Sequence, residues 1–228
     1  MVSERPGGAT APRGANPAYD VEMTERQAND DSPTRRPYAK GVARRSQIIE
    51  SAIAEFATRG VDGTSLRTLG EAIGVSHATL RHYFASRDEL LVEVYRAHEE
   101  RFSAEAPSEG AAVELMADSA ERNRDVPGLV RLYATLSADA LQNDHAASTE
   151  FIRERFRTLR ERLAARIREE QIEGQVSADI DPTDAAALVI AASDGLQVQW
   201  LLAPDTVDVH RSLALLEHIL PGPDTTED

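Results

Sequence analysis

The stretch from residue 64 to residue 87, TSLRTLGEAIGVSHATLRHYFASR, constrains the fold more than any other part of the chain. It has the pattern of two short helices joined at Gly74, because glycine readily adopts the left-handed conformation just past a helix end. Ser65 and Ser76 each precede a helical pattern and are expected to act as N-caps. Each helix also has one apolar face, formed by Leu66, Leu69 and Ile73 in the first and by Leu80 and Phe84 in the second. The pattern predicts a helix-turn-helix.

The second of these helices, roughly residues 77–84, is expected to present four side chains outward: His77, Ala78, Arg81 and His82. Gly70 lies four residues before Gly74, where a small residue lets the two helices cross closely. A small helical protein with capped helices and glycines in its turns is the alternative interpretation. The caps, the small residue and both apolar faces fall at the required spacings together, which favours the DNA-binding motif.

An amphipathic helix is predicted immediately before this motif, over residues 42–59. Its apolar stripe is formed by Ile48, Ile49, Ala52, Ile53 and Phe56, and charged residues occupy the other face. The two helices of the motif can pack their apolar faces against this stripe. The N-terminal part is therefore expected to be a three-helix head.

The charge of the chain is distributed unevenly. Its formal net charge is −14, but residues 35–87 carry nine Lys and Arg against four acids, whereas residues 88–228 carry thirteen against twenty-nine. A basic head on an acidic body meets the electrostatic requirement for binding phosphates.

Residues 43–91 resemble the N-terminal domain of the TetR-type transcriptional repressors. In that family a helix ending in phenylalanine and glycine precedes the helix-turn-helix, and a "YF" signature followed by "SKEEL" leads into a fourth helix. The matching positions are Phe56, Gly60, Thr64, Gly74, Val75, Ser76, Tyr83, Phe84, Ser86, Glu89 and Leu90. Two positions differ from the usual pattern: Arg81 replaces a tyrosine and Arg87 replaces a lysine.

The resemblance and the donor chemistry together imply a DNA-contacting surface. Arg81 is expected to read guanine, whose O6 and N7 atoms suit a guanidinium; contact with phosphate alone is the open alternative. His77 and His82 are expected to meet base edges; exposure to solvent without a DNA contact is the alternative. The remaining candidates contact phosphates or lie on the same surface: Lys40, Arg44, Arg45, Thr64, Ser65, Ser76, Ala78, Thr79, Tyr83 and Arg87.

Residues 1–39 are rich in Pro, Gly, Ala, Asp and Asn and are expected to form a disordered tail. Its basic end, from Arg35 to Lys40, can follow phosphates or enter the minor groove; a solvated linker is the equal alternative. Met23 is a possible alternative start.

The rest of the chain predicts an all-α protein, with the head at residues 40–86 and a helical effector-binding and dimerisation domain at residues 87–221. A fourth helix over residues 86–101 begins with a capping box, Ser86 to Glu89, and joins head to body. The helical patterns that follow cover residues 108–124, 127–143, 147–173, 182–203 and 207–220, and no alternating strand pattern stands out. Small residues in 182–203, with an apolar stripe in 207–220, predict a homodimer through a four-helix bundle, as in the family. An intramolecular core is the alternative.

The family usually holds a small molecule among these helices. Aromatic, thioether, amide and hydroxyl groups of the body supply the candidate contacts: Met116, Ser119, Asn123, Tyr133, Leu136, Phe156, Gln197 and Trp200. Plain core packing is the alternative for each. Because this set contains few cations, we expect a neutral or cationic effector. The sequence does not identify which molecule it is.

Several classes of function find little support. The chain has no cysteine, no glycine-rich phosphate loop, no nucleophile elbow and no metal-ligand spacing, so neither an enzyme nor a metal or cofactor is expected. The first residues lack the apolar segment of a secretory signal, and the apolar run at residues 185–203 contains Asp194, Gln197 and Gln199, which argues against a membrane span. A cytoplasmic repressor of a palindromic operator, released by an effector, is the expected function. A constitutive DNA binder, an activator and a helical protein–protein adaptor are the alternatives.

Overall fold

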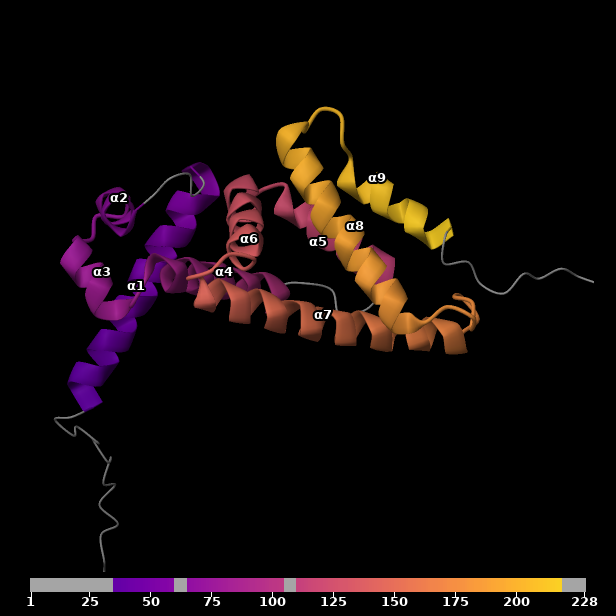
Figure 1. Ribbon diagram of the computed structural model, residues 1–228, viewed down its shortest axis with the longest axis horizontal. Coiled ribbons are helices and arrows are strands. Elements are labelled where there is room, and N and C mark those ends of the chain that lie inside the picture. The colour runs from indigo at the N-terminus through magenta and orange to yellow at the C-terminus, as the bar shows by residue number, and fades with distance from the viewer. Residues whose placement is uncertain (1–34, 60–64, 105–109, 219–228) are drawn as a thin grey trace, which may run out of the picture.

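The computed structural model describes residues 35–59, 65–104 and 110–218, and every regular element within them is helical (Figure 1). The all-α prediction is therefore confirmed for these residues. The head occupies one end of the molecule, and α8 and α9 lie at the other end, with α7 running between them.

Helix α1, Arg35–Arg59, begins seven residues before the predicted start at residue 42. Proline is compatible with the first turn of a helix, where an amide donor has no intrahelical partner, so Pro37 does not prevent this early start. The predicted disordered tail is thus wrong for residues 35–39. The rest of that tail, with Met23, lies outside the described residues, as do Gly60 and Thr64.

The helix-turn-helix is formed by α2, Leu66–Ala72, and α3, His77–Tyr83. Both predicted caps are present: Ser65 Oγ accepts the amide of Thr68 at 3.2 Å, and Ser76 Oγ accepts the amide of Thr79 at 3.1 Å. Gly74 has φ +69°, the left-handed conformation that the sequence predicted.

Gly70 makes the close crossing of the two helices possible. Its carbonyl accepts the amide of Val75 at 2.7 Å, and a Cβ at residue 70 would lie 2.3 Å from the carbonyl oxygen of Val75. Leu69, Leu80 and Phe84 are almost fully buried beneath the turn. The motif therefore depends on glycine at this position, since even alanine would add a Cβ.

Helix α4, Arg87–Ala104, connects the head to the body. Ser86 caps it, accepting the amide of Glu89 at 3.0 Å, while the Glu89 carboxylate accepts the amide of Ala85 at 2.7 Å. The predicted capping box is therefore extended by one residue, because the side chain of Glu89 reaches the amide before the cap.

The described part of the body contains five further helices and a short 3₁₀ turn. Their bounds are Ala112–Asn123 for α5, Pro127–Asp139 for α6, Ala146–Ile172 for α7, Pro182–Leu202 for α8 and Val209–Ala214 for α9, followed by η1, Leu215–His218. Within the described part of the chain, α8 alone is long and apolar enough to cross a bilayer by length and composition. One side of α8 is buried in the protein, including Ala186, Val189 and Ile190.

Two apolar clusters form the core. The first joins α1, α2 and α3 to α4, α6 and the start of α7; the second joins α5, α8 and α9 to the rest of α7. Head and body also meet through Gly128, where an added Cβ would lie 1.7 Å from the carbonyl oxygen of Phe56 in α1. The start of α6 thus packs directly against the backbone of α1.

Candidate nucleic-acid interface and effector cavity

The exposed face of α3 carries the four side chains that the sequence placed outward. His77, Ala78, Arg81 and His82 are all exposed, while Leu80 between them is buried. Within this seven-residue helix the four lie at i, i+1, i+4 and i+5, which is one side of the helix. Their exposure confirms the predicted orientation, and contact with DNA remains a prediction.

Three predicted DNA contacts also serve the helix caps. Ser65 Oγ lies 3.1 Å from Thr68 Oγ1, and Ser76 Oγ lies 2.8 Å from Thr79 Oγ1. Each serine oxygen already accepts a backbone amide. In each Ser–Thr pair one hydroxyl donates its proton to the other, and the proton of the second hydroxyl is available to a phosphate oxygen. Thr64, a further hydroxyl of the prediction, lies outside the described residues.

Arg45 has a role inside the head that the sequence did not predict. Its Nη2 donates to Glu93 Oε2 at 2.7 Å, and its guanidinium lies 5.0 Å from the centre of the Phe84 ring. The side chain therefore joins α1 to α4 across the end of α3. A phosphate contact by Arg45 would require this ion pair to break or be shared.

The other predicted phosphate contacts differ in exposure. Lys40 and Arg44 are exposed on α1, whereas Tyr83 and Arg87 are half-buried. The Tyr83 ring packs edge-on against His82, with the ring centres 4.9 Å apart. His82 is thus supported by its neighbour while it remains exposed.

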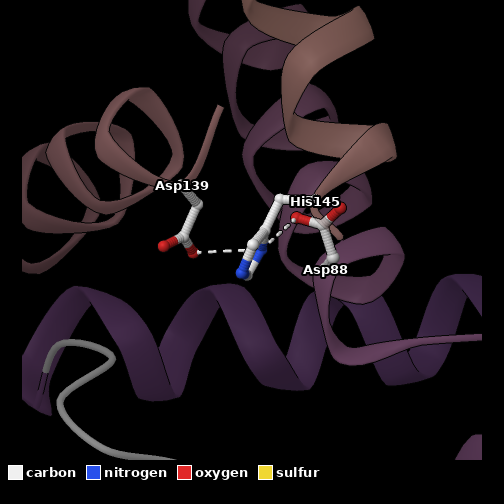
Figure 2. Close-up of side chains that lie close together, drawn as sticks. All are labelled: Asp88, Asp139 and His145. Carbon is white, nitrogen blue, oxygen red and sulfur yellow. Dashed lines mark ion pairs between the residues drawn. The ribbon is translucent and has the colours of Figure 1, made fainter. Parts of the chain in front are cut away.

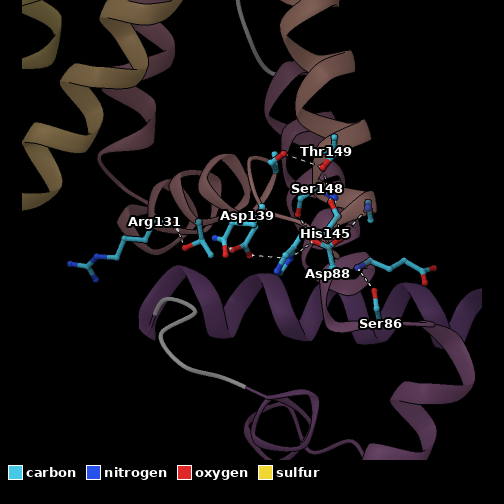
Figure 3. Close-up of polar contacts among 12 residues, drawn as sticks. Ser86, Asp88, Arg131, Asp139, His145, Ser148 and Thr149 are labelled. Carbon is cyan, nitrogen blue, oxygen red and sulfur yellow. Dashed lines mark hydrogen bonds and ion pairs between the residues drawn. The ribbon is translucent and has the colours of Figure 1, made fainter.

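The start of α7 is capped by a side chain from α4 (Figure 3). Asp88 Oδ2 accepts the amides of Ala147 at 3.0 Å and Ser148 at 3.2 Å, and Ser148 Oγ donates to Asp88 Oδ1. No side chain of α7's own N-cap residue makes a capping hydrogen bond. The carboxylate is buried and faces the positive end of the α7 dipole, so the contact ties the head-proximal end of α4 to the body.

Figure 2 shows Asp88 together with Asp139 and His145. His145 Nδ1 lies 3.5 Å from Asp88 Oδ1 and 3.7 Å from Asp139 Oδ2, and the three side chains place one possible ligand atom each within 4.8 Å of one another. Sequence spacing missed this cluster because Asp88 is far from the other two in the chain. Both oxygens of Asp88 already accept hydrogen bonds from α7, so the cluster is accounted for as a junction between α4, α6 and α7.

A cavity of about 380 Å³ lies between α4, α5 and α7. A smaller hollow adjoins it, shares Tyr95, His98 and Met116 with it, and reaches α6 and α8. Five predicted effector contacts line one or both spaces: Met116, Ser119, Asn123, Tyr133 and Gln197. Asn123 Nδ2 donates to Gln197 Oε1 at 2.6 Å, which joins two of these predicted contacts across α5 and α8.

The other three predicted effector contacts lie elsewhere. Leu136 is fully buried in the core that includes the head, and Phe156 packs against both apolar clusters without lining either space. Trp200 lines a separate surface hollow near Arg124 and Pro204. Helical periodicity gives a residue's face on its own helix, but it does not say which neighbouring helix covers that face.

The cavity wall carries more cations than the sequence predicted. Arg122, Arg155, Arg162 and Arg166 line it, against Glu99 and Glu169. The expectation of a cavity with few cations is therefore wrong. Arg122 lies on α5, and the other three lie on α7, whose alternating Arg and Glu pattern is also typical of a solvated helix face.

A polar network crosses the smaller hollow. Arg155 Nε donates to Glu99 Oε1 at 2.8 Å and Arg155 Nη1 to Tyr133 Oη at 3.3 Å, while Tyr133 Oη donates to Asp194 Oδ2 at 2.7 Å. Burial raises the pKa of Asp194 above its ordinary value, and it raises the pKa of Tyr133 as well. Burial lowers the pKa of the nearby His98, which favours its neutral form.

These elements define a class of protein: a helix-turn-helix head joined by α4 to a helical body that contains a cavity. The model of bacterial regulatory proteins of the tetR family matches residues 48–94, and the model of the BetI-type transcriptional repressor C-terminal domain matches residues 109–222. The chain belongs to the TetR family of transcriptional regulators.

Individual relatives agree with this assignment. The HTH-type transcriptional regulator UidR of Escherichia coli K12 is 25% identical over 156 residues, which cover 67% of this chain and 79% of UidR. A TetR-family regulator from Cytophaga hutchinsonii has the same fold, with a TM-score of 0.64 at 18% identity over 79% of this chain and 94% of that one. SmeT, solved as a complex with triclosan, gives a TM-score of 0.59 at 19% identity over 82% of this chain and 95% of SmeT.

Proposed function

We propose that the protein is a homodimeric repressor in the cytoplasm, that it binds a palindromic operator through α3 of both subunits, and that a small molecule in the cavity releases it. The observation that carries the release step is the position of α4. One end of this helix follows α3 and contacts α7 through Asp88, while Tyr95, His98, Glu99 and Phe102 line the cavity further along. Asp88 and His98 are about 15 Å apart along the helix, at 1.5 Å per residue.

A ligand in the cavity would touch α4 on one side and α5 and α7 on the other. Ligand binding that favours a different tilt of α4 would change the separation of two heads in a dimer, and a fixed operator accepts only one separation. The structure of the similar protein SmeT in complex with triclosan supports the expectation that a protein of this fold binds an organic molecule.

The exposed side of α8 supports the dimer. Leu188, Val198 and Leu202 are 47%, 43% and 82% exposed, and Ala191 and Gly195 lie between them on the same side. Leu215 in η1 adds a further apolar side chain that is 61% exposed. Small residues flanked by exposed leucines suit the close packing of helices from two subunits.

Selection of bound sequences from random duplex DNA tests the operator. The full-length protein, at a stated near-physiological salt concentration, should recover a palindrome whose half-sites are about one helical turn or a multiple of it apart. Recovery of a single half-site would contradict the dimer. Binding without any sequence preference that disappears with modest salt would contradict the repressor itself, because it indicates phosphate contacts alone.

A further inference from the structure

We infer that the cavity between α4, α5 and α7 binds an amphipathic organic anion: an apolar body carrying an oxyanion head, held by Arg122 and Arg162. The inference rests on the proposed effector site and names the chemical class of its ligand. It follows from which arginines of the cavity wall already have acidic partners and which do not.

Two of the four arginines are neutralised within the protein. Arg155 pairs with Glu99 at 2.8 Å, and Arg166 pairs with Glu169 at 2.9 Å while its Nε donates to the carbonyl of Gly110 at 2.6 Å. These pairs use both acids that line the main cavity. The guanidinium groups of Arg155 and Arg166 are thus committed to internal contacts.

The other two arginines have no ion pair with any described residue. The guanidinium of Arg122 lies 4.9 Å from the centre of the Phe102 ring, and its buried Nε has no hydrogen-bond partner among the described residues. Arg162, one turn before Arg166 on α7, is exposed at the cavity wall. A buried donor without a partner costs free energy, so an incoming oxyanion gains from satisfying it.

Neither cation forms an ion pair within the described part of the chain, and Arg122 also borders the surface hollow that contains Glu121, Asp125 and Asp205. Asp194 lies in the adjoining hollow and accepts a hydrogen bond from Tyr133, and burial raises its pKa, which favours the uncharged form. Burial lowers the pKa of His98, which favours its neutral form. A cationic ligand would therefore meet two unpaired guanidinium groups, whereas a carboxylate or sulfate can accept from them in pairs.

The remainder of the wall is apolar and aromatic. Phe102, Leu115 and Met116 face the cavity from α4 and α5, and Leu159 and Leu163 face it from α7. A volume of about 380 Å³ falls within the range of small-molecule sites. The ligand is thus expected to bury an alkyl or aromatic body while its charged head meets the arginines.

Matched ten-carbon probes test the inference by titration calorimetry on the full chain: decanoate, decyl sulfate and decylammonium below their micelle concentrations, and decanol below its solubility limit. Decanoate or decyl sulfate should bind about tenfold or more tightly than decanol, and decylammonium more weakly still. The two anions distinguish a preference for carboxylate from a preference for sulfate. Equal or tighter binding of decanol or decylammonium, or no binding of any probe, would overturn the inference.

Substitutions of single arginines test which side chains bind the charged head group of the ligand. Arg122→Gln and Arg162→Gln should each weaken binding of the anion about tenfold and leave decanol unchanged, while Arg153→Gln, on the exposed side of α7, should change neither. Arg162 is exposed, so its substitution tests the assignment even if Arg122→Gln perturbs folding. Anion binding that is insensitive to Arg122→Gln and Arg162→Gln would contradict the assignment.

The same titrations on the protein–operator complex separate this inference from the proposed function. Release of operator by decanol or decylammonium alone would uphold effector release and overturn the anionic class. Anion binding that depends on both arginines but leaves the operator bound would uphold the ligand class and contradict effector release.

Discussion

Asp88 in the first turn of α4 caps the N-terminus of α7 by accepting the backbone amide and the side-chain hydroxyl of Ser148. A second body helix is capped in the same way, since Glu170 of α7 accepts the amide of Ala112 at the start of α5 at 2.6 Å. Both carboxylates are buried, and each comes from a helix other than the one it caps. These contacts fix the ends of α5 and α7 on either side of the cavity.

Asp88→Ala should therefore destabilise the whole protein. It leaves two α7 amides and one hydroxyl without their acceptor in a buried position, at an expected cost of about 2–4 kcal/mol in the free energy of unfolding. Urea unfolding followed by circular dichroism measures this. Asp179→Ala, at an exposed position in the loop after α7, is the control and should change little. Equal effects of the two substitutions would show that the cap contributes nothing measurable.

Gly70→Ala should disrupt the helix-turn-helix. The new Cβ would lie 2.3 Å from the carbonyl oxygen of Val75, and backbone atoms cannot move aside without changing the turn. We expect a loss of about 2 kcal/mol or more and weaker DNA binding. Gly41→Ala is the matched control on α1, because nothing lies within 4 Å of its Cβ and alanine favours helix there. It should be neutral or slightly stabilising by the same unfolding measurement.

The sequence predicted the helix-turn-helix well because its determinants are local. Ser65, Ser76 and Gly74 act on residues within four positions of themselves, so caps and turn can be recognised from spacing alone. The early start of α1 was missed because Arg35 to Ala39 carry no apolar periodicity.

The cavity could be predicted only in part, because its contacts are distant in sequence. Tyr133 and Asp194 are 61 positions apart, and Arg155 and Glu99 are 56 apart. The arginine-rich face of α7 has the same pattern whether it meets solvent or a cavity, since periodicity does not reveal the facing helix. Trp200 was predicted to contact the effector because it is an aromatic residue on a body helix, but it lines a different hollow.

Asp194→Asn should make the protein more stable at neutral pH. Burial raises the pKa of this carboxyl in the folded protein, so the folded state holds its proton more tightly than the unfolded chain does, and ionisation at neutral pH costs stability. That cost is absent below the ordinary value of 3.8 and appears as the pH rises through the folded value. The Tm difference between variant and parent should therefore be positive at pH 7 and shrink toward pH 4. A difference that is independent of pH would indicate that the charge of Asp194 is not responsible.

Arg81→Ala separates base reading from phosphate contact. Arg81 is exposed on α3 and has no ion pair with any described residue. If it reads guanine, its removal should cost about 1–3 kcal/mol for the selected operator and much less for unrelated DNA, so that specificity falls at one base position of each half-site. Fluorescence anisotropy with both duplexes at one salt concentration measures this. A uniform loss on both duplexes, with a shallower salt dependence, would assign Arg81 to a phosphate.

Leu188→Glu should separate the subunits. Leu188 is 47% exposed on the side of α8 that also carries Ala191 and Gly195, and a second copy would place two carboxylates near each other at a two-fold contact. Leu141→Glu is the control: Leu141 is 90% exposed and lies just after α6, where the neighbouring Ala140 carbonyl accepts a hydrogen bond from Thr149 of α7. Light scattering should give a monomer for the first variant and a dimer for the second. Operator affinity should fall for Leu188→Glu alone, because one head reads only half of a palindrome. A dimer that survives Leu188→Glu, with operator binding unchanged, would place the subunit contact on another surface.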